Sequence, residues 1–220
     1  MSFIKINKPN IKQPLDKIET LSDAAQYLED SYETEITAKH FKGLTLSALD
    51  LSEFTFEQVI FENCRFIGCS FHKASFTDVV FNSCDLSNAN LSNSYMSRCA
   101  FEEVKAVGAN FLESFFRNVS IEKSIFKYAT LHGVKADTLN IVASDFDESF
   151  FSDCKLKAAA FDKVSLMRSE FFRTPLKGID LSSCNIEQLL VSSEKSELKG
   201  VIVNTAQAVE FAKLLGIRVV

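Results

Sequence analysis

The chain has 220 residues, a formal net charge of −5 and 21 phenylalanines, but only seven glycines, three prolines and no tryptophan. The mildly acidic balance weighs against a protein that binds nucleic acid, because such binding rests on Lys and Arg neutralising phosphates. The sequence contains no stretch of about 18 apolar residues, so it predicts no membrane span. The first residues lack the apolar core of a signal peptide. We therefore expect a cytoplasmic protein that contacts neither nucleic acid nor membrane directly.

Residues 1–35 contain no clear repeat, and we expect them to form an N-terminal cap segment. Within them the stretch LSDAAQYLED predicts a short helix. Ser22 is the expected N-cap residue, because a Ser hydroxyl accepts a hydrogen bond from the first free backbone N–H groups of a helix.

The next part of the chain places an apolar residue at every fifth position, which we call position i. From Leu46 to Val191 the 30 such positions hold 14 Phe, 9 Leu, 3 Ile, 2 Ala, 1 Met and 1 Val, with no break in phase. Ile36 and Phe41 stand in the same phase, so we assign the repeat to residues 36–195. A helix buries a face every 3.6 residues or so and a strand every second residue, and neither period fits.

The other positions of the unit also follow a rule. Position i−2 is mostly small, and positions i−1, i+1 and i+2 are mostly polar. We expect i and i−2 to point inward, in coils that stack so that each buries the apolar residues of its neighbours. The core is expected to include Phe61, Phe66, Phe71, Phe76 and Phe81.

All six cysteines fall at position i−2, and no CxxC pair, the usual spacing of a zinc site, occurs. We expect them to act as small buried hydrophobic residues. Cys64 and Cys84 would lie one coil apart, close enough for a disulfide in an oxidising compartment, but a cytoplasmic location disfavours that bond.

Several units, at residues 84–88, 89–93 and 109–113, follow the pattern A(D/N)Lxx, with Cys in place of Ala in the first and Phe in place of Leu in the last. This unit resembles the signature of the pentapeptide repeat family, and the resemblance covers at least residues 44–193. It implies an all-β solenoid, a right-handed quadrilateral β-helix with four units in each coil. Residues 20 apart would then lie over one another at a spacing of ~4.8 Å, with their rings stacked.

Four units per coil sort the charges onto four sides, which we name after the first central residue of each. The formal charges sum to −4 on the Phe61 side, −3 on the Leu51 side, −1 on the Leu46 side and +3 on the Phe56 side. Rows of carboxylates could imitate duplex phosphates and attract a basic DNA channel, although an ordinary solvated surface explains them too. The residues expected to bind a partner are Asp50, Glu53, Glu62, Glu102, Glu103, Glu113, Asp145, Asp147 and Glu148.

Residues 196–220 are expected to form a C-terminal capping helix and tail. The stretch NTAQAVEFAKLLG predicts a helix from Thr205, with Asn204 as N-cap and Gly216 just after the last turn. The final IRVV predicts a strand.

This ending resembles the C-terminal segment of the quinolone-resistance (Qnr-type) pentapeptide proteins of Gram-positive bacteria. The likeness lies in residues 198–200, 206–208 and 214–217. It implies a homodimer, whose interface would include Phe211, Leu214, Leu215 and Ile217.

No constellation of catalytic, phosphate-binding or metal-binding residues is apparent, so we expect no enzyme, no metal and no cofactor. The resemblance implies a DNA mimic that binds a type II topoisomerase, DNA gyrase, and modulates quinolone action. The alternative is a generic repeat scaffold for protein–protein interaction without a topoisomerase role.

Overall fold

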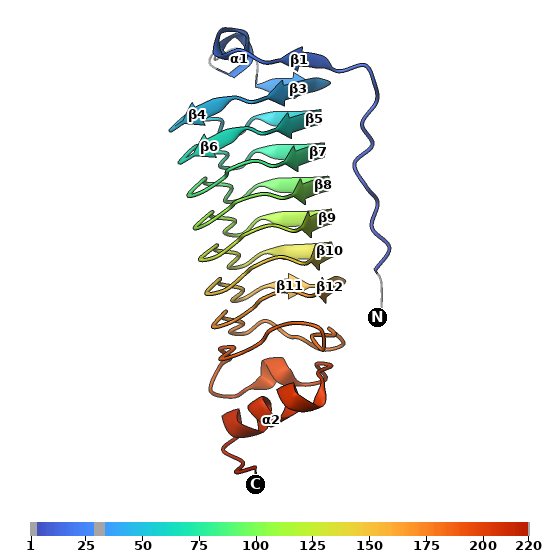
Figure 1. Cartoon of the computed structure of the whole chain (residues 1–220), viewed down its shortest axis with the longest axis vertical. Helices are drawn as coiled ribbons and strands as arrows, with labels where there is room; N and C mark the ends of the chain where they lie inside the picture. The colour runs from blue at the N-terminus through green and yellow to red at the C-terminus, as the bar shows by residue number, and fades with distance from the viewer. Residues whose placement is uncertain (1–3, 29–33, 220) are drawn as a thin grey trace.

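The computed structural model describes residues 4–28 and 34–219. These residues form a rod of stacked coils, with β1 (Asp16–Ile18) and α1 (Leu21–Leu28) at one end and α2 (Thr205–Leu214) at the other (Figure 1). A short 3-10 helix, Ser196–Leu198, precedes α2. Residues 4–14 run beside the rod rather than within it (Figure 1).

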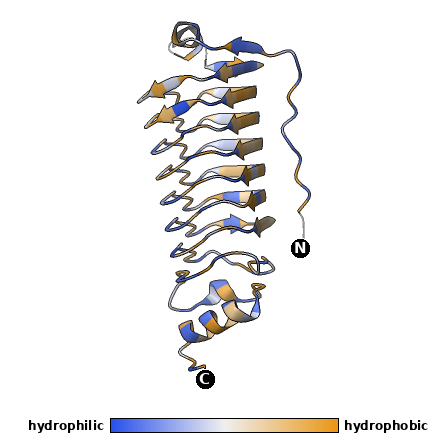
Figure 2. Cartoon of the chain, in the orientation of Figure 1, coloured by the Kyte–Doolittle hydropathy of each residue, from blue (hydrophilic) through white to orange (hydrophobic). Residues whose placement is uncertain are grey.

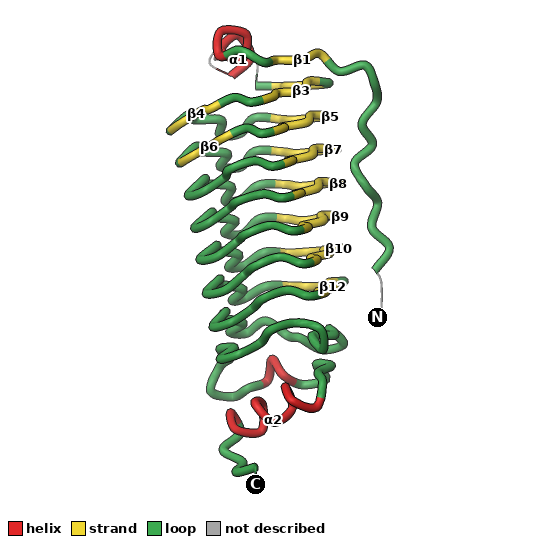
Figure 3. The backbone as a smooth tube through the Cα atoms, viewed as in Figure 1, coloured by secondary structure: helices red, strands yellow, loops and turns green. Residues whose placement is uncertain are grey.

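The strands are parallel, and the longer ones stack over one another along the Phe56 and Phe61 sides of the rod (Figure 3). The pairing order is β1-β3-β5-β7-β8-β9-β10-β11, with β2 on β5, β12 on β10, and β4 on β6 in a separate sheet. After β1 they are β2 (Glu35–Thr37), β3 (Lys39–Lys42), β4 (Thr45–Ser47), β5 (Thr55–Glu62), β6 (Arg65–Ile67), β7 (Ser75–Asn82), β8 (Tyr95–Glu102), β9 (Phe115–Glu122), β10 (Lys135–Val142), β11 (Lys155–Leu156) and β12 (Ala159–Asp162).

The expected coil of 20 residues is confirmed by the strand register. Phe61 of β5 lies opposite Phe81 of β7, and Phe81 lies opposite Phe101 of β8. Their rings stack with centroids 5.1 Å and 4.9 Å apart. Phe41 extends the same column by one coil, at 5.2 Å from Phe61. The columns of phenylalanine therefore form a continuous aromatic core along the rod axis.

Of the 30 central residues, all but Leu156 and Val191 are buried. Leu156 departs from the expectation, and the corner that follows it also departs from the usual one. Ala158, at position i+2 of that unit, lacks the positive φ found at most other corners, and a bend replaces the usual corner there.

Position i+2 forms the corner of each unit by adopting the left-handed conformation. Asn63, Asp78 and Asn118 have φ values of 54°, 56° and 56°, and the same sign recurs at nearly every unit. This conformation costs a non-glycine residue roughly 1 kcal/mol. The cost is offset because each corner N–H bonds to the neighbouring coil, as from Asn63 to the Asn82 carbonyl oxygen at 2.9 Å. Four such corners close one coil.

The six cysteines are free and buried. The thiol of Cys154 donates to the carbonyl oxygen of Leu131 at 3.0 Å, and that of Cys99 to the carbonyl of Phe76 at 3.5 Å. Burial raises the pKa of Cys99 and of Cys154 to about 12.

We expect these two thiols to react with a thiol reagent such as DTNB at least ~1,000-fold more slowly than free cysteine, because the thiolate is the reactive form and is both scarce and enclosed. Mass spectrometry of the labelled native protein, with the protein unfolded in guanidinium as control, measures this. Rapid native labelling of Cys99 would contradict the inward placement.

Both ends of the rod are closed by capped helices. α1 begins one residue before Ser22, because Thr20 is its cap: the Thr20 hydroxyl accepts from the Asp23 N–H at 3.1 Å. The expectation of Ser22 as N-cap was therefore wrong. The last two residues of the predicted helix, Glu29 and Asp30, lie outside the described residues.

At the other end, Asn204 caps α2 as expected, in a reciprocal pair with Gln207. Gly216 follows the helix with φ 78°, also as expected. The predicted final strand is wrong for residues 217–219, because the Ile217 N–H turns back to the Ala212 carbonyl oxygen at 2.9 Å. Val220 lies outside the described residues.

Candidate functional site

Asp and Asn at position i−1 hold the corners of the coil rather than standing free. Oδ1 of Asp50 accepts from the Ser52 N–H at 3.0 Å and the Ser52 hydroxyl at 2.5 Å, and these bonds lower the pKa of Asp50. Oδ1 of Asp145 accepts from the Asp147 N–H at 3.0 Å in the same way. Because these side chains form Asx turns, Asp and Asn at position i−1 stabilise the coil itself.

Several other carboxylates pair with a basic side chain one coil away. Glu53 lies 3.5 Å from Lys73 and Glu103 lies 4.0 Å from Lys123, measured between Oε1 and Nζ. Such exposed pairs contribute about 0–1 kcal/mol each, and each pair cancels the charge of its carboxylate. A shorter pair of this kind joins Glu148 and Arg168 at 2.5 Å.

The Leu46 side carries the cluster Asp145, Asp147 and Glu148, yet little of its charge is free. Lys127 Nζ lies 3.1 Å from Asp145 and 3.4 Å from Asp147. Asp147 is only 6% exposed and accepts from the Ser165 hydroxyl at 2.5 Å. We conclude that this cluster is a structural network.

Glu62 is paired, contrary to the expectation of a free carboxylate on the Phe61 side. Its Oε1 and Oε2 lie 2.8 Å from Lys42 Nζ and 2.9 Å from His40 Nε2. The hydrogen bond from Lys42 lowers the pKa of Glu62. The pair forms because the repeat reaches back to Phe41, so that Lys42 lies opposite Glu62 in β3 and β5.

Glu102 and Glu113 make no side-chain hydrogen bond or ion pair with any residue in 4–28 or 34–219, and both are exposed. Glu102 on β8 lies directly opposite Glu122 on β9, which is also exposed and likewise unpaired among the described residues. Like charges opposite one another in neighbouring strands repel. Sequence reasoning did not select Glu122, although its spacing of 20 from Glu102 is the signal for it.

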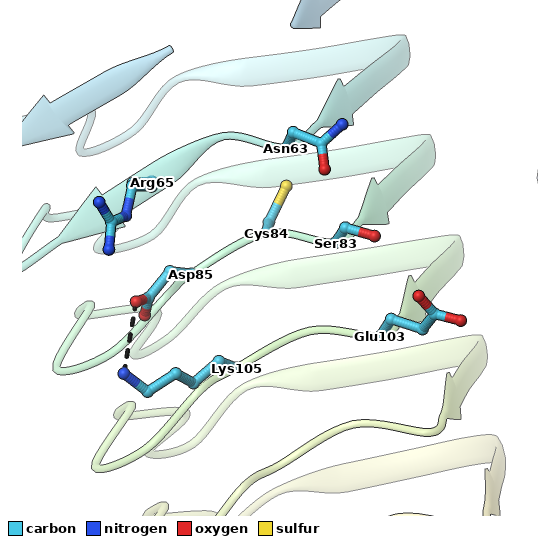
Figure 4. A pocket seen from close by; sticks show the side chains of 7 residues that line it. All are labelled: Asn63, Arg65, Ser83, Cys84, Asp85, Glu103 and Lys105. Carbon is cyan, nitrogen blue, oxygen red and sulfur yellow. Dashed lines mark hydrogen bonds and ion pairs between the residues drawn. The ribbon is translucent and has the colours of Figure 1, made fainter. Parts of the chain in front are cut away.

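A shallow polar depression lies on the Leu46 side where three coils meet (Figure 4). Arg65, Asp85 and Lys105 follow one another in successive coils, with Lys105 Nζ 3.5 Å from Asp85 Oδ2. Cys84 lies behind them; its thiol donates to the carbonyl oxygen of Phe61 at 3.3 Å, and the neighbouring Cys64 thiol together with burial raises its pKa. With Glu103, which also lines the depression, the charges cancel, and the Cys84 thiol stays protonated.

The C-terminal segment presents an apolar surface. Of the four residues expected at a dimer interface, Phe211 is 9% exposed and packs within its own chain. Leu214, Leu215 and Ile217 are 40%, 60% and 54% exposed. Leu215 and Ile217 line a groove with Leu198 and other apolar residues of this end. Hydrophobic residues recur along α2 and the chain after it (Figure 2).

Within the part of the chain that the structure describes, no three His, Cys, Asp or Glu side chains gather as a metal site. No helix among the described residues is long and apolar enough to span a membrane.

The family model of pentapeptide repeats matches residues 46–82 and 84–122 in eight copies. No curated protein matches the sequence. Among solved structures, QnrB1, a plasmid-mediated fluoroquinolone resistance protein, is 21% identical with a TM-score of 0.43, over 92% of this chain and 95% of that one. HetL, a pentapeptide repeat protein involved in heterocyst differentiation regulation in the cyanobacterium Nostoc, is 15% identical with a TM-score of 0.32, over 82% of this chain and 93% of that one.

Similarity at this level says nothing about function. The eight repeats matched by the family model lie in the part of the rod where the coils stack 20 residues apart. Residues 46–82 and 84–122 are therefore pentapeptide repeats.

Proposed function

We propose that this repeat rod binds a type II topoisomerase, DNA gyrase, in place of a DNA segment and thereby modulates quinolone action. The proposal assigns no catalytic role to the chain and places it in the cytoplasm. It keeps residues 1–35 as the cap segment, 36–195 as the repeat domain and 196–220 as the capping helix and tail.

The pair Glu102 and Glu122 is the observation that carries this proposal. Two exposed carboxylates face each other across neighbouring strands with no described cation beside them. Their repulsion is relieved when a basic surface approaches, so the free rod is poised for such a partner. Glu113 is an exposed carboxylate without a described ion-pair partner on the Leu51 side, so the opposite flank of the rod also presents a negative charge.

The shape of the rod supports the same partner. Its Leu51 and Phe61 sides are opposite flanks, and both are acidic. Glu102 and Glu122 on the Phe61 side are separated by one coil, ~4.8 Å, compared with the ~3.4 Å between phosphates of one DNA strand. The likeness of residues 198–217 to Qnr-type proteins points to gyrase among the enzymes with a basic DNA channel.

The test is gyrase supercoiling at increasing concentrations of the protein, with and without a quinolone. We expect the wild-type chain to inhibit supercoiling or to reduce drug-induced cleavage at micromolar concentration. The variant Glu102→Lys/Glu122→Lys is expected to lose at least tenfold in potency. The matched control Glu57→Lys/Glu187→Lys changes the net charge equally on the other two sides and should lose less than threefold.

Equal losses in the two variants would reduce the effect to net charge and contradict a specific acidic flank. If the wild-type chain affects neither supercoiling nor drug-induced cleavage, the gyrase proposal fails, and the function is that of a general scaffold for protein–protein interaction. The cross-coil ion pairs favour that second candidate, because they leave much of the surface neutral and suited to a protein partner of mixed charge.

We further propose that the chain forms a homodimer through the C-terminal segment. Leu215 and Ile217 are more than half exposed, which is unusual for two large apolar residues side by side on a groove. The variant Leu215→Asp/Ile217→Asp is expected to sediment as a monomer at concentrations where the wild type is a dimer. A control at the outward Phe150, Phe150→Asp, should leave the dimer intact, and a monomeric wild type would contradict the proposal.

A further inference from the structure

Residues 4–14, which we call the strap, cross the coils of the rod almost along its axis (Figure 1). Three of its backbone N–H groups donate to side chains of three different coils. Lys12 donates to Gln58 Oε1 at 3.3 Å, Asn10 to Asp78 Oδ1 at 2.8 Å, and Asn7 to Asn118 Oδ1 at 3.0 Å. The strap is therefore bound by side-chain acceptors of the rod and not as a strand of its sheet.

The three acceptors are equivalent corner residues of the Phe56 side. Together with Arg98 they form one column, Gln58, Asp78, Arg98 and Asn118, which we call the seam. From Asn7 to Asn10 the strap advances three residues, or ~10 Å of extended chain, while the seam advances two coils, also ~10 Å. An extended polypeptide thus matches the repeat of the seam, and the match requires no particular side chain at the bonded positions.

Several residues along the seam are buried, although they stand at outward positions of the repeat. Asp78, Ser97 and Ala100 are 5%, 5% and 4% exposed. The corresponding corners of the next side, among them Asn63 and Ser83, are exposed. A bidentate ion pair from Arg98 holds Asp78 at 2.6 Å, which keeps its carboxylate fixed beneath the strap.

The strap has the composition of a bound ligand. Ile4, Ile6 and Ile11 are half-buried, whereas Lys5, Lys8 and Lys12 are exposed, so aliphatic and basic side chains alternate toward and away from the rod. Figure 2 shows this alternation in colour along the strap. Because residues 4–14 carry three lysines and no carboxylate, release of the strap changes the net charge of what remains from −5 to −5 − 3 = −8.

The strap is attached weakly compared with the coils. Its attachment consists of three backbone hydrogen bonds and half-buried side chains, and each such bond contributes about 0.5–1.5 kcal/mol. Ordering its eleven residues costs conformational entropy, which opposes this gain. A competing segment with the same features therefore meets little resistance.

We propose that the seam is a binding site for an extended peptide segment of a partner protein, and that the strap is a ligand in cis that covers it. The strap itself defines the ligand class: aliphatic residues alternate with lysines, and free backbone N–H groups face the seam. This site is separate from the acidic flanks and does not depend on gyrase being the partner.

The experiment uses full-length protein and a fluorescent peptide with the sequence IKINKPNIKQP, followed by fluorescence anisotropy. The variant Asn10→Pro removes the N–H that donates to Asp78 and loosens the strap. We expect it to bind the peptide at least tenfold more tightly than the wild type, whose own strap competes. Adding Gln58→Ala/Asn118→Ala removes two acceptors of the seam and should weaken binding at least fivefold.

Two further measurements make the result decisive. Hydrogen exchange of residues 4–14 verifies that the strap is released in Asn10→Pro. If the strap stays bound in that variant, the variant Ile6→Asp/Ile11→Asp is used in its place. A scrambled peptide of equal charge tests for simple attraction, and a peptide with its half-buried Ile residues replaced by Asn should bind several-fold more weakly. No peptide binding by a folded chain with a released strap, or equal binding of the scrambled peptide, would overturn the proposal.

Discussion

Replacing Phe101 by alanine is expected to lower the free energy of unfolding by about 3–5 kcal/mol, because it opens a cavity in a core that has no side chain free to fill it. The Phe101 ring is 1% exposed and stacks on Phe81 at 4.9 Å. It also meets the edges of Phe111 at 6.3 Å and Phe126 at 6.0 Å. Urea unfolding followed by far-UV circular dichroism measures the change.

The matched control is Phe150→Ala, a phenylalanine of the same repeat that points outward and is 37% exposed. We expect it to cost less than about 1 kcal/mol, since a surface substitution leaves no cavity. If the two variants lost equal stability, the distinction between inward and outward positions would fail.

The second large effect is expected at Gln207, which joins α2 to the last coils. Gln207 is 7% exposed, and its Nε2 donates to the carbonyl oxygens of Leu181 and Cys184, each at 2.8 Å. Its Oε1 accepts from the Asn204 N–H at 2.9 Å. Gln207→Ala leaves these groups without partners and should cost about 2–3 kcal/mol.

Glu210→Ala serves as control on the same helix, since Glu210 is exposed and pairs only with Lys213 at 2.7 Å. It should change the free energy of unfolding by less than about 0.5 kcal/mol. Hydrogen exchange across residues 181–214 adds a local readout: we expect faster exchange there in Gln207→Ala and unchanged exchange in the first coils. Uniformly faster exchange would contradict a local cap.

The inward columns could be predicted because burial is decided within each unit of five. The inward positions of Phe61 and Phe81 can be predicted from their spacing alone, and so can that of the small residue at position i−2. Spacing did not reveal why Cys154 suits position i−2: its thiol donates to the carbonyl of the preceding coil, at 3.0 Å from Leu131. Nor did it reveal that Asn63 and its equivalents adopt positive φ, because a corner is a property of the closed coil.

The surface was harder to predict, because its charges interact between coils. Asp50 was expected to meet a partner but forms the turn at Ser52, and Glu62 is neutralised by Lys42. A sum of charges over a side counts these residues as if they were free. The strap was missed for another reason: it has no repeat, and backbone N–H groups attach it, which leave no mark in the sequence.

The 20-residue coil is tested most directly by NMR couplings across hydrogen bonds, which identify the donor and acceptor of each bond. The structure joins the Leu91 N–H to the Asn110 carbonyl, Phe111 to Thr130 and Phe151 to Glu170, each at 2.7 Å and each 19 residues ahead. We expect couplings between these pairs. Couplings from these three N–H groups to carbonyls at any other separation, in a folded sample, would contradict the stacked rod and the surfaces derived from it.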